Sequence, residues 1–181
     1  MSVKTSVSHP LRIDIVKPIS TSGRIGMTLC PGKQQDDALS GRWQRNLNLD
    51  IKRIVDAGAI TVVTLMEMHE LEKLGVKNLG QEIEKVELMW HHLPIVDRCA
   101  PADSFELQWE KVGDELRNNL HKGDLIVLHC MGGLGRTGTV AARLLIELGE
   151  SPLSAIKRVR HTRPGAIETR VQEDYINSLI F

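Results

Sequence analysis

The chain has 181 residues, a length that suits one domain with a full hydrophobic core. Its 23 Lys and Arg residues balance 23 Asp and Glu residues, so the overall charge gives no indication of nucleic-acid or membrane binding. No apolar run approaches the roughly 18 residues that a membrane-spanning helix needs, and three cysteines do not make a disulfide framework.

We expect a single domain over residues 1–181, with residues 1–10 flexible. Those ten residues are polar and lack the apolar stretch of a secretory signal peptide. Because the cysteines form no disulfide framework, a reducing cytoplasm is the expected location. We also expect a monomer that binds neither nucleic acid nor a membrane.

Apolar, β-branched runs alternate with amphipathic stretches along the chain. Gly58 and Gly123 each end a predicted helix, and Ser151 before Pro152 is the expected start of a later one. This alternation predicts an α/β fold with a mostly parallel central sheet flanked by helices, whose functional site lies at the carboxyl end of a strand. The predicted strands cover residues 11–16, 24–29, 59–65, 88–95 and 125–129, and the predicted helices cover 49–57, 67–74, 81–86, 104–121 and three segments after residue 129, the first of them 139–148.

Residues 31–45 form a polar segment in which we expect a loop. Lys33, Arg42 and Arg45 give this loop positive charge. It is therefore a candidate surface for contact with an anionic substrate.

The most informative segment is residues 129–138, with the sequence HCMGGLGRTG. It lies between a predicted strand and a predicted helix, where free backbone N–H groups and the positive end of the helix dipole bind anions. In this setting we expect Cys130 to be mostly thiolate and a ready nucleophile. Arg136 offers a planar, two-pronged donor that matches two oxygens of a phosphoryl group.

The other residues of this segment have supporting roles. Thr137 is expected to donate a hydrogen bond to the sulfur of Cys130 and so ease its departure from a covalent intermediate. His129 is expected to brace the loop from a buried position rather than to act as a base. The glycines let the backbone approach an oxyanion closely. The predicted phosphate-binding residues are Met131, Gly132, Gly133, Leu134, Gly135 and Arg136.

This segment resembles the H-C-x-x-G-x-x-R-[ST]-G signature loop of the cysteine-dependent protein tyrosine phosphatases. It is most similar to the atypical dual-specificity phosphatases of the cyclin-dependent-kinase-associated group, and residues 26–32, 91–97 and 164–172 resemble further segments of that group. The resemblance implies the protein tyrosine phosphatase fold and a cysteinyl-phosphate intermediate. It also implies a phosphorylated protein as partner, with a protein kinase as one candidate, and it implies no metal or other cofactor.

The implied reaction needs a general acid to protonate the leaving group. Asp97 follows a predicted strand and matches the family's Pro-x-x-Asp pattern, so we favour it. Asp103 precedes Ser104 and an amphipathic stretch, which makes helix capping its expected role. Arg98 is either a substrate contact or a solvated loop charge.

Three further features leave alternatives open. Gln172 matches a family position that orients water or contacts substrate, or it is a glutamine on a helix surface. Arg163 and Arg170 flank a Pro-Gly turn and either bind an anionic substrate or form a solvated basic patch. Cys30 or Cys99 could trap the oxidised nucleophile as a reversible disulfide.

Few aromatic residues are available to wall a deep phosphotyrosine cleft: three Trp, two Phe and a single Tyr. We therefore expect a shallow pocket that accepts phosphoserine, phosphothreonine and phosphotyrosine. Met131 and Leu134 stand where lipid phosphatases carry lysines, which argues against a highly phosphorylated inositol substrate. Two alternatives remain: a phosphoprotein-binding module with negligible turnover, and a phosphatase for phosphoinositides or RNA 5′-phosphates.

Overall fold

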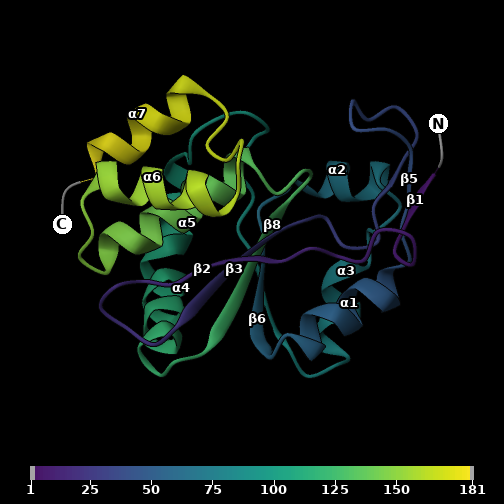
Figure 1. The fold of residues 1–181 in the computed structure, drawn as a ribbon, viewed down its shortest axis with the longest axis horizontal. Coiled ribbons are helices and arrows are strands. Elements are labelled where there is room, and N and C mark those ends of the chain that lie inside the picture. The colour runs from purple at the N-terminus through teal and green to yellow at the C-terminus, as the bar shows by residue number, and fades with distance from the viewer. Residues whose placement is uncertain (1–2, 180–181) are drawn as a thin grey trace.

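A computed structural model describes residues 3–179 (Figure 1). Its centre is a five-stranded sheet. The strands, in the order in which they lie side by side, are β2 (Asp14–Val16), β3 (Arg24–Leu29), β8 (Leu125–Cys130), β6 (Ala59–Thr64) and β7 (Met89–His92). β2 is antiparallel to β3, and the other neighbouring pairs are parallel. The predicted α/β fold with a mostly parallel central sheet is confirmed.

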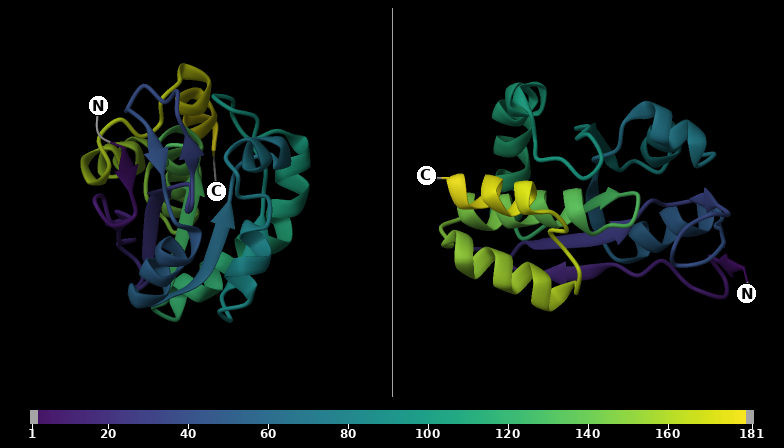
Figure 2. Two further views of the ribbon diagram at one scale, coloured as in Figure 1. Left: turned by 90° about the vertical axis from the view of Figure 1, so that its right-hand side faces the viewer. Right: turned by 90° about the horizontal axis from the view of Figure 1, so that it is seen from above.

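Helices flank this sheet. They are α1 (Leu47–Asp56), α2 (Met68–Lys73), α3 (Leu79–Glu84), α4 (Asp103–His121), α5 (Gly135–Glu147), α6 (Pro152–Thr162) and α7 (Arg170–Ser178). In Figure 1, α1 to α3 lie on the right of the sheet and α4 to α7 on the left, and Figure 2 shows the helices packed around the strands from two further sides. α5 contacts β8 and β3, while α6 and α7 pack on α5.

The core is densest where β8 and α5 meet. The continuous apolar run of β8 is typical of a central parallel strand covered on both faces, and all six of its residues are buried. In α5, every residue from Gly135 to Ile146 is buried. Since burial of a Leu or Val side chain contributes about 1.5–3 kcal/mol, these two elements anchor the loop that joins them.

Most element boundaries differ from the prediction by one or two residues, and those of β2, β7 and α5 differ by three or four. β2 begins at Asp14 rather than at residue 11. β7 ends at His92, before the predicted end at residue 95, although the N–H of Leu93 still donates to the carbonyl oxygen of Thr64 (3.0 Å). α5 begins at Gly135 rather than at residue 139, because the N–H of Gly138 already donates to the carbonyl oxygen of Leu134 at 2.8 Å. A glycine-rich first turn has no side-chain pattern from which its helical character could be predicted.

The polar segment 31–45 is not only a loop. It contains β4 (Gln34–Gln35) and β5 (Trp43–Gln44), and β1 (Lys4–Thr5) pairs with β5 to make a small three-stranded sheet. The prediction missed these strands because two residues are too few to show an alternating pattern. Of the segment expected to be flexible, residues 1–2 lie outside the described part of the chain, and the flexibility of residues 3–10 stays a prediction.

Within residues 3–179, no helix combines the length and apolar character needed to cross a membrane.

Candidate active site

The loop after β8 places Cys130 at the carboxyl edge of the sheet. Cys130 is buried and lies opposite Leu29 of β3 in the parallel register. Gly133 has φ +69°, and a Cβ there would lie 2.2 Å from the carbonyl oxygen of Thr28. Only glycine fits this position. The loop therefore turns back tightly against β3 before it enters α5.

The side chain of Arg136 projects from the first turn of α5 and is almost fully buried. Its guanidinium makes a bidentate contact with Glu70, with N–O distances of 2.7 and 2.9 Å, and donates to the carbonyl oxygen of Ile95 at 3.0 Å. Burial lowers the pKa of Arg136, but the hydrogen bonds to Glu70 and the nearby charges of Cys130, Glu70 and Asp97 together outweigh this effect and raise the pKa overall. A guanidinium has five N–H donors, so this fixed cation retains donors for an oxyanion.

Asp97 lies in the loop after β7, and the structure brings it to Arg136. Its Oδ1 atom is 3.0 Å from an NH2 nitrogen of Arg136, and 59% of its side chain is exposed. Asp103, by contrast, is the exposed first residue of α4, and the N-cap residue is Ala102. The capping role expected for Asp103 is therefore wrong, although a carboxylate in the first turn still favours the helix dipole.

His129 and Thr137 flank the nucleophile from within the core. His129 is fully buried, and its Nε2 atom lies 2.7 Å from the hydroxyl of Thr64. Burial lowers the pKa of His129 to about 3, so the ring is neutral near pH 7. This state suits a brace rather than a base. Thr137 is also fully buried, and within residues 3–179 its hydroxyl has no hydrogen-bond partner.

Gln172 is buried in the first turn of α7 and is not a helix-surface residue. Its Oε1 atom accepts from the N–H groups of Glu168 (3.0 Å) and Thr169 (3.2 Å), while its Nε2 atom donates to the carbonyl oxygen of Cys99 at 3.3 Å. A Cβ at Gly135 would lie 3.0 Å from its amide atoms. Gln172 therefore joins the start of α7 to the catalytic loop and to the loop that carries Asp97.

A family model described as "Polymorphic toxin system, DSP-PTPase phosphatase" matches residues 41–150. Cyclin-dependent kinase inhibitor 3 of Rattus norvegicus is 32% identical over 162 residues, which cover 88% of this chain and 73% of that protein. The chain belongs to the dual-specificity phosphatases. The solved structure of kinase associated phosphatase, with its catalytic cysteine substituted by serine, has a TM-score of 0.81 and 29% identity over 92% of each chain. Tk-PTP in its active form has a TM-score of 0.66 and 28% identity, over 87% of this chain and 94% of that one.

These similarities confirm the predicted family, fold and activity. The chain is an atypical dual-specificity protein phosphatase of the cyclin-dependent-kinase-associated group, and it has the protein tyrosine phosphatase fold.

Glu70 of this phosphatase was not among the predicted site residues, although it contacts Arg136. Residues 67–70 contain a capping box, in which the Oε2 atom of Glu70 accepts from the N–H of Glu67 at 2.8 Å. That box is a local signal for the start of a helix. The contact of the same carboxylate with Arg136 joins residues 66 positions apart, and no local pattern could have indicated it.

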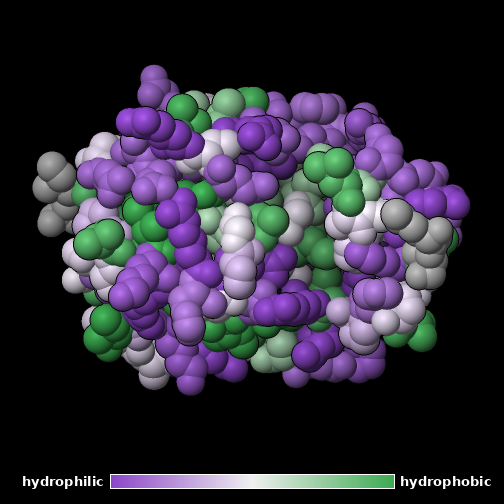
Figure 3. Space-filling view, turned by 45° about the horizontal axis from the view of Figure 1, so that its top comes forward, coloured by the Kyte–Doolittle hydropathy of each residue, from purple (hydrophilic) through white to green (hydrophobic). Residues whose placement is uncertain are grey.

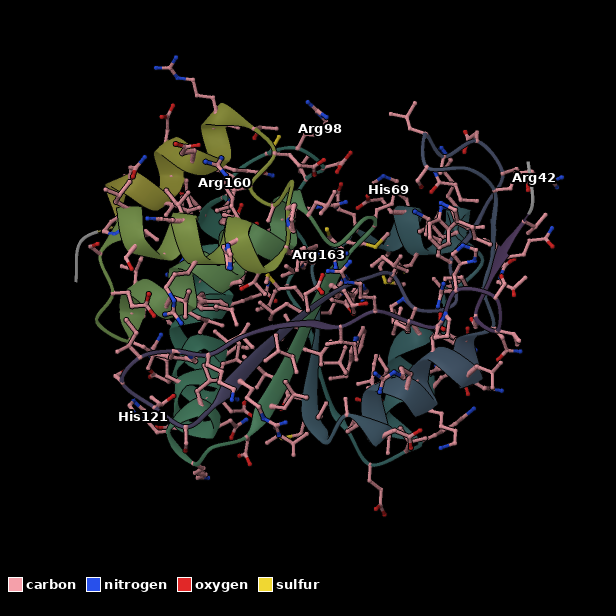
Figure 4. All side chains as sticks on the ribbon, in the orientation of Figure 1. Arg42, His69, Arg98, His121, Arg160 and Arg163 are labelled. Carbon is pink, nitrogen blue, oxygen red and sulfur yellow. The ribbon has the colours of Figure 1, made fainter. Side chains whose placement is uncertain are left out.

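Two of the three basic residues in segment 31–45 are held in ion pairs. Arg45 is buried in a bidentate ion pair with Asp50, at 2.7 and 2.8 Å. Arg42 pairs with Asp36 at 3.0 Å and points away from the molecule at the right of Figure 4. Arg45 also lines the pocket that contains Leu134, and for both residues the expected contact with substrate stays a prediction.

Lys33, the third, is buried beside the catalytic loop. Its ammonium donates to the carbonyl oxygen of Met131 at 3.4 Å. Burial lowers the pKa of Lys33, and the nearby thiols of Cys30 and Cys130 partly offset this effect. Burial also raises the pKa of Cys30. Cys30, Cys99 and Cys130 are free thiols, and a disulfide that traps oxidised Cys130 stays a prediction.

Arg163 braces the catalytic loop from outside. Its guanidinium donates to the carbonyl oxygens of Gly132 (3.0 Å) and Gly133 and pairs with Asp14 at 2.7 Å. Figure 4 shows Arg163 near the centre of the molecule, below Arg98. The side chain of Arg170 is 92% exposed, as a solvated charge would be. Because Arg163 holds the carbonyl groups on the outside of the loop, the loop N–H groups are free to face inward.

A pocket of about 530 Å³ adjoins the catalytic loop. Leu134, Trp43 and Pro164 are among the residues that line it. Trp43 supplies an aromatic wall from the segment in which the sequence analysis expected a polar loop. Figure 3 shows the upper side of the molecule as mainly hydrophilic, with hydrophobic side chains between the polar ones. Within residues 3–179, no group of three or more His, Cys, Asp or Glu residues is placed to hold a metal ion.

Proposed function

We propose that this phosphatase dephosphorylates phosphotyrosine, phosphoserine and phosphothreonine in proteins through a cysteinyl-phosphate on Cys130. The observation that carries the proposal is the meeting of two loops at one sheet edge. Arg136, on the loop that begins at Cys130, lies 3.0 Å from Asp97 on the loop after β7. A nucleophile, a fixed cation and an acid are thereby available to one phosphoryl group.

In the first step, the thiolate of Cys130 attacks phosphorus and the bond from phosphorus to the leaving oxygen breaks. Asp97, in its protonated form, transfers its proton to that oxygen. Arg136 and the backbone N–H groups of the loop stabilise the charge on the other phosphoryl oxygens. The backbone donors come from Met131, Gly132, Gly133, Leu134, Gly135 and Arg136.

In the second step, Asp97 is a carboxylate and accepts a proton from a water molecule that attacks phosphorus. The sulfur–phosphorus bond breaks and inorganic phosphate forms. The hydroxyl of Thr137 donates to the departing sulfur, and this acceptor would satisfy a buried hydroxyl that otherwise costs free energy. Gln172 supports the loops around the water, and His129 braces the nucleophile as a neutral ring.

The relatives of this chain indicate the class of its partner. One is a cyclin-dependent kinase inhibitor and another is a kinase associated phosphatase. We therefore infer that the substrate is a phosphorylated protein, with a protein kinase as the first candidate. Action without a metal or other cofactor, a monomeric state and a cytoplasmic location belong to the same proposal and stay predictions.

The test is phosphate release from phosphotyrosine and phosphothreonine peptides, a phosphoinositide and 5′-triphosphate RNA, with EDTA and a thiol reductant present. Cys130→Ser should abolish turnover, and Asp97→Asn should lower it about 10²–10⁴-fold. Asp103→Asn is the matched control, because it changes the other candidate acid and should leave turnover unchanged. Turnover of only the lipid or the RNA would reject the protein substrate. Turnover of peptides by Cys130→Ser would reject the mechanism.

A further inference from the structure

A carboxylate of the protein already occupies part of the phosphate cradle. The N–H of Gly135, the first residue of α5, donates to the Oε2 atom of Glu168 at 2.8 Å. A Cβ at Gly135 would lie 2.6 Å from the same oxygen. The carboxylate therefore rests directly on the backbone of the catalytic loop.

The N–H of Gly135 is a donor that a bound phosphoryl group also needs. It lies at the N-terminus of α5, where free N–H groups and the helix dipole attract any anion, whether carboxylate or phosphate. A second carboxylate, that of Asp97, lies 3.0 Å from Arg136 in the same cradle. In the free enzyme, the carboxyl groups of Glu168 and Asp97 thus already border the anion site, in addition to Glu70, which pairs with Arg136.

The backbone of Glu168 is held in place by a hydrogen bond, whereas its side chain is free to move. The N–H of Glu168 donates to the Oε1 atom of the buried Gln172 at 3.0 Å, which holds the backbone against the loop. The residue itself is exposed, so the carboxylate can move into solvent when another anion takes its place. Displacement then costs the hydrogen bond to Gly135 and little packing.

We propose that Glu168 is an internal competitor of the substrate phosphoryl group and sets the affinity of the free enzyme for it. This inference rests on the proposed function, because it assumes that phosphate binds in the loop around Cys130. A phosphoryl oxygen takes the N–H of Gly135 only after the carboxylate of Glu168 has left it. Removing that carboxylate removes both the competing hydrogen bond and a charge that repels the incoming dianion.

The test is calorimetric titration of the protein with inorganic phosphate. Glu168→Gln should bind phosphate about tenfold more tightly than the wild type, because the charged acceptor that competes for the N–H of Gly135 is removed. Glu168→Ala should also bind more tightly. An increase in affinity is informative, because a substitution that damaged the catalytic loop would weaken phosphate binding instead.

Asp174→Asn is the matched control, because it removes one exposed carboxylate of α7 that lies 3.7 Å from Arg170 and so changes the net charge equally. It should bind phosphate as the wild type does. Hydrolysis of a small aryl phosphate is measured beside each titration, and its KM should fall in Glu168→Gln. Suppose that Glu168→Gln binds phosphate as the wild type does or more weakly, while the wild type turns over the aryl phosphate normally. This result would overturn the role of Glu168 and leave the proposed function standing. A wild type that neither binds phosphate nor turns over the aryl phosphate would overturn this role and the proposed function together.

Discussion

The buried imidazole of His129 should make the fold sensitive to acid. An ordinary histidine has a pKa near 6.5, whereas burial lowers the pKa of His129 in the folded protein to about 3. Below pH 6.5 the unfolded chain therefore binds a proton that the folded chain does not. The free energy of unfolding therefore falls as the pH drops from about 6.5 to about 3. The share of this free energy that depends on a neutral His129 is fully present only above that range.

The two pKa values set the size of the effect. Between pH 7 and pH 4.5, the titration of His129 alone should lower the free energy of unfolding by about 2–3 kcal/mol, and by about 5 kcal/mol once the pH is below both values. His129→Asn retains a polar group near Thr64 but does not titrate. This variant should be less stable than the wild type at pH 7, yet lose about 2–3 kcal/mol less on acidification to pH 4.5.

Urea unfolding followed by circular dichroism at pH 7, 6, 5 and 4.5 measures this difference. His121→Asn, which changes an exposed histidine at the end of α4, is the matched control and should follow the wild-type pH dependence. His129→Gln replaces His129→Asn if the latter does not fold. Equal losses of stability in the wild type and the His129 variant between pH 7 and 4.5 would refute the reasoning.

Three further predictions concern residues around the catalytic loop. Glu70→Gln removes the charge that pairs with the buried Arg136, so it should destabilise the fold by as much as about 3–5 kcal/mol and lower kcat; unchanged urea unfolding and turnover would contradict this. Lys33→Met removes a buried ammonium whose pKa is lowered by burial. Because the unfolded wild type binds that proton more tightly, wild-type stability should rise as the pH approaches the ordinary lysine value of 10.5, and Lys33→Met should lack this rise; parallel unfolding curves from pH 7 to 10 would refute it. Trp43→Ala should lower kcat/KM for phosphopeptides about tenfold, on the scale of truncating an interface aromatic, and leave a small aryl phosphate unaffected; equal losses on both substrates would indicate a structural role.

The sequence predicted those parts of the fold whose signals are local. The apolar runs at 59–65 and 125–129 indicated two central strands, because a strand buried on both faces needs continuous apolar sequence. Residues 24–29 indicated only an edge or hairpin strand, whereas β3 pairs with β2 and also lies inside the sheet, beside β8. The signature loop could be recognised for a similar reason. Its chemistry depends on residue types at fixed spacing within ten positions, from His129 to Gly138.

The contacts that the sequence did not indicate join distant segments through single side chains. Glu70 reaches Arg136, and Arg163 reaches the carbonyl groups of the catalytic loop, across tens of residues. The burial of Arg45 with Asp50 likewise could not be distinguished from an exposed charge by composition. Such pairings depend on how the chain folds back on itself, which periodicity and capping signals do not encode.

The most direct test of the mechanism is to trap its covalent intermediate. The wild type is mixed rapidly with a phosphothreonine peptide, quenched in acid and digested, and the peptide that contains Cys130 is analysed by mass spectrometry. The mechanism predicts one phosphoryl group on Cys130 at short reaction times and none in Cys130→Ser. Phosphate release without a phosphoryl group on Cys130, or with one on another residue, would contradict it.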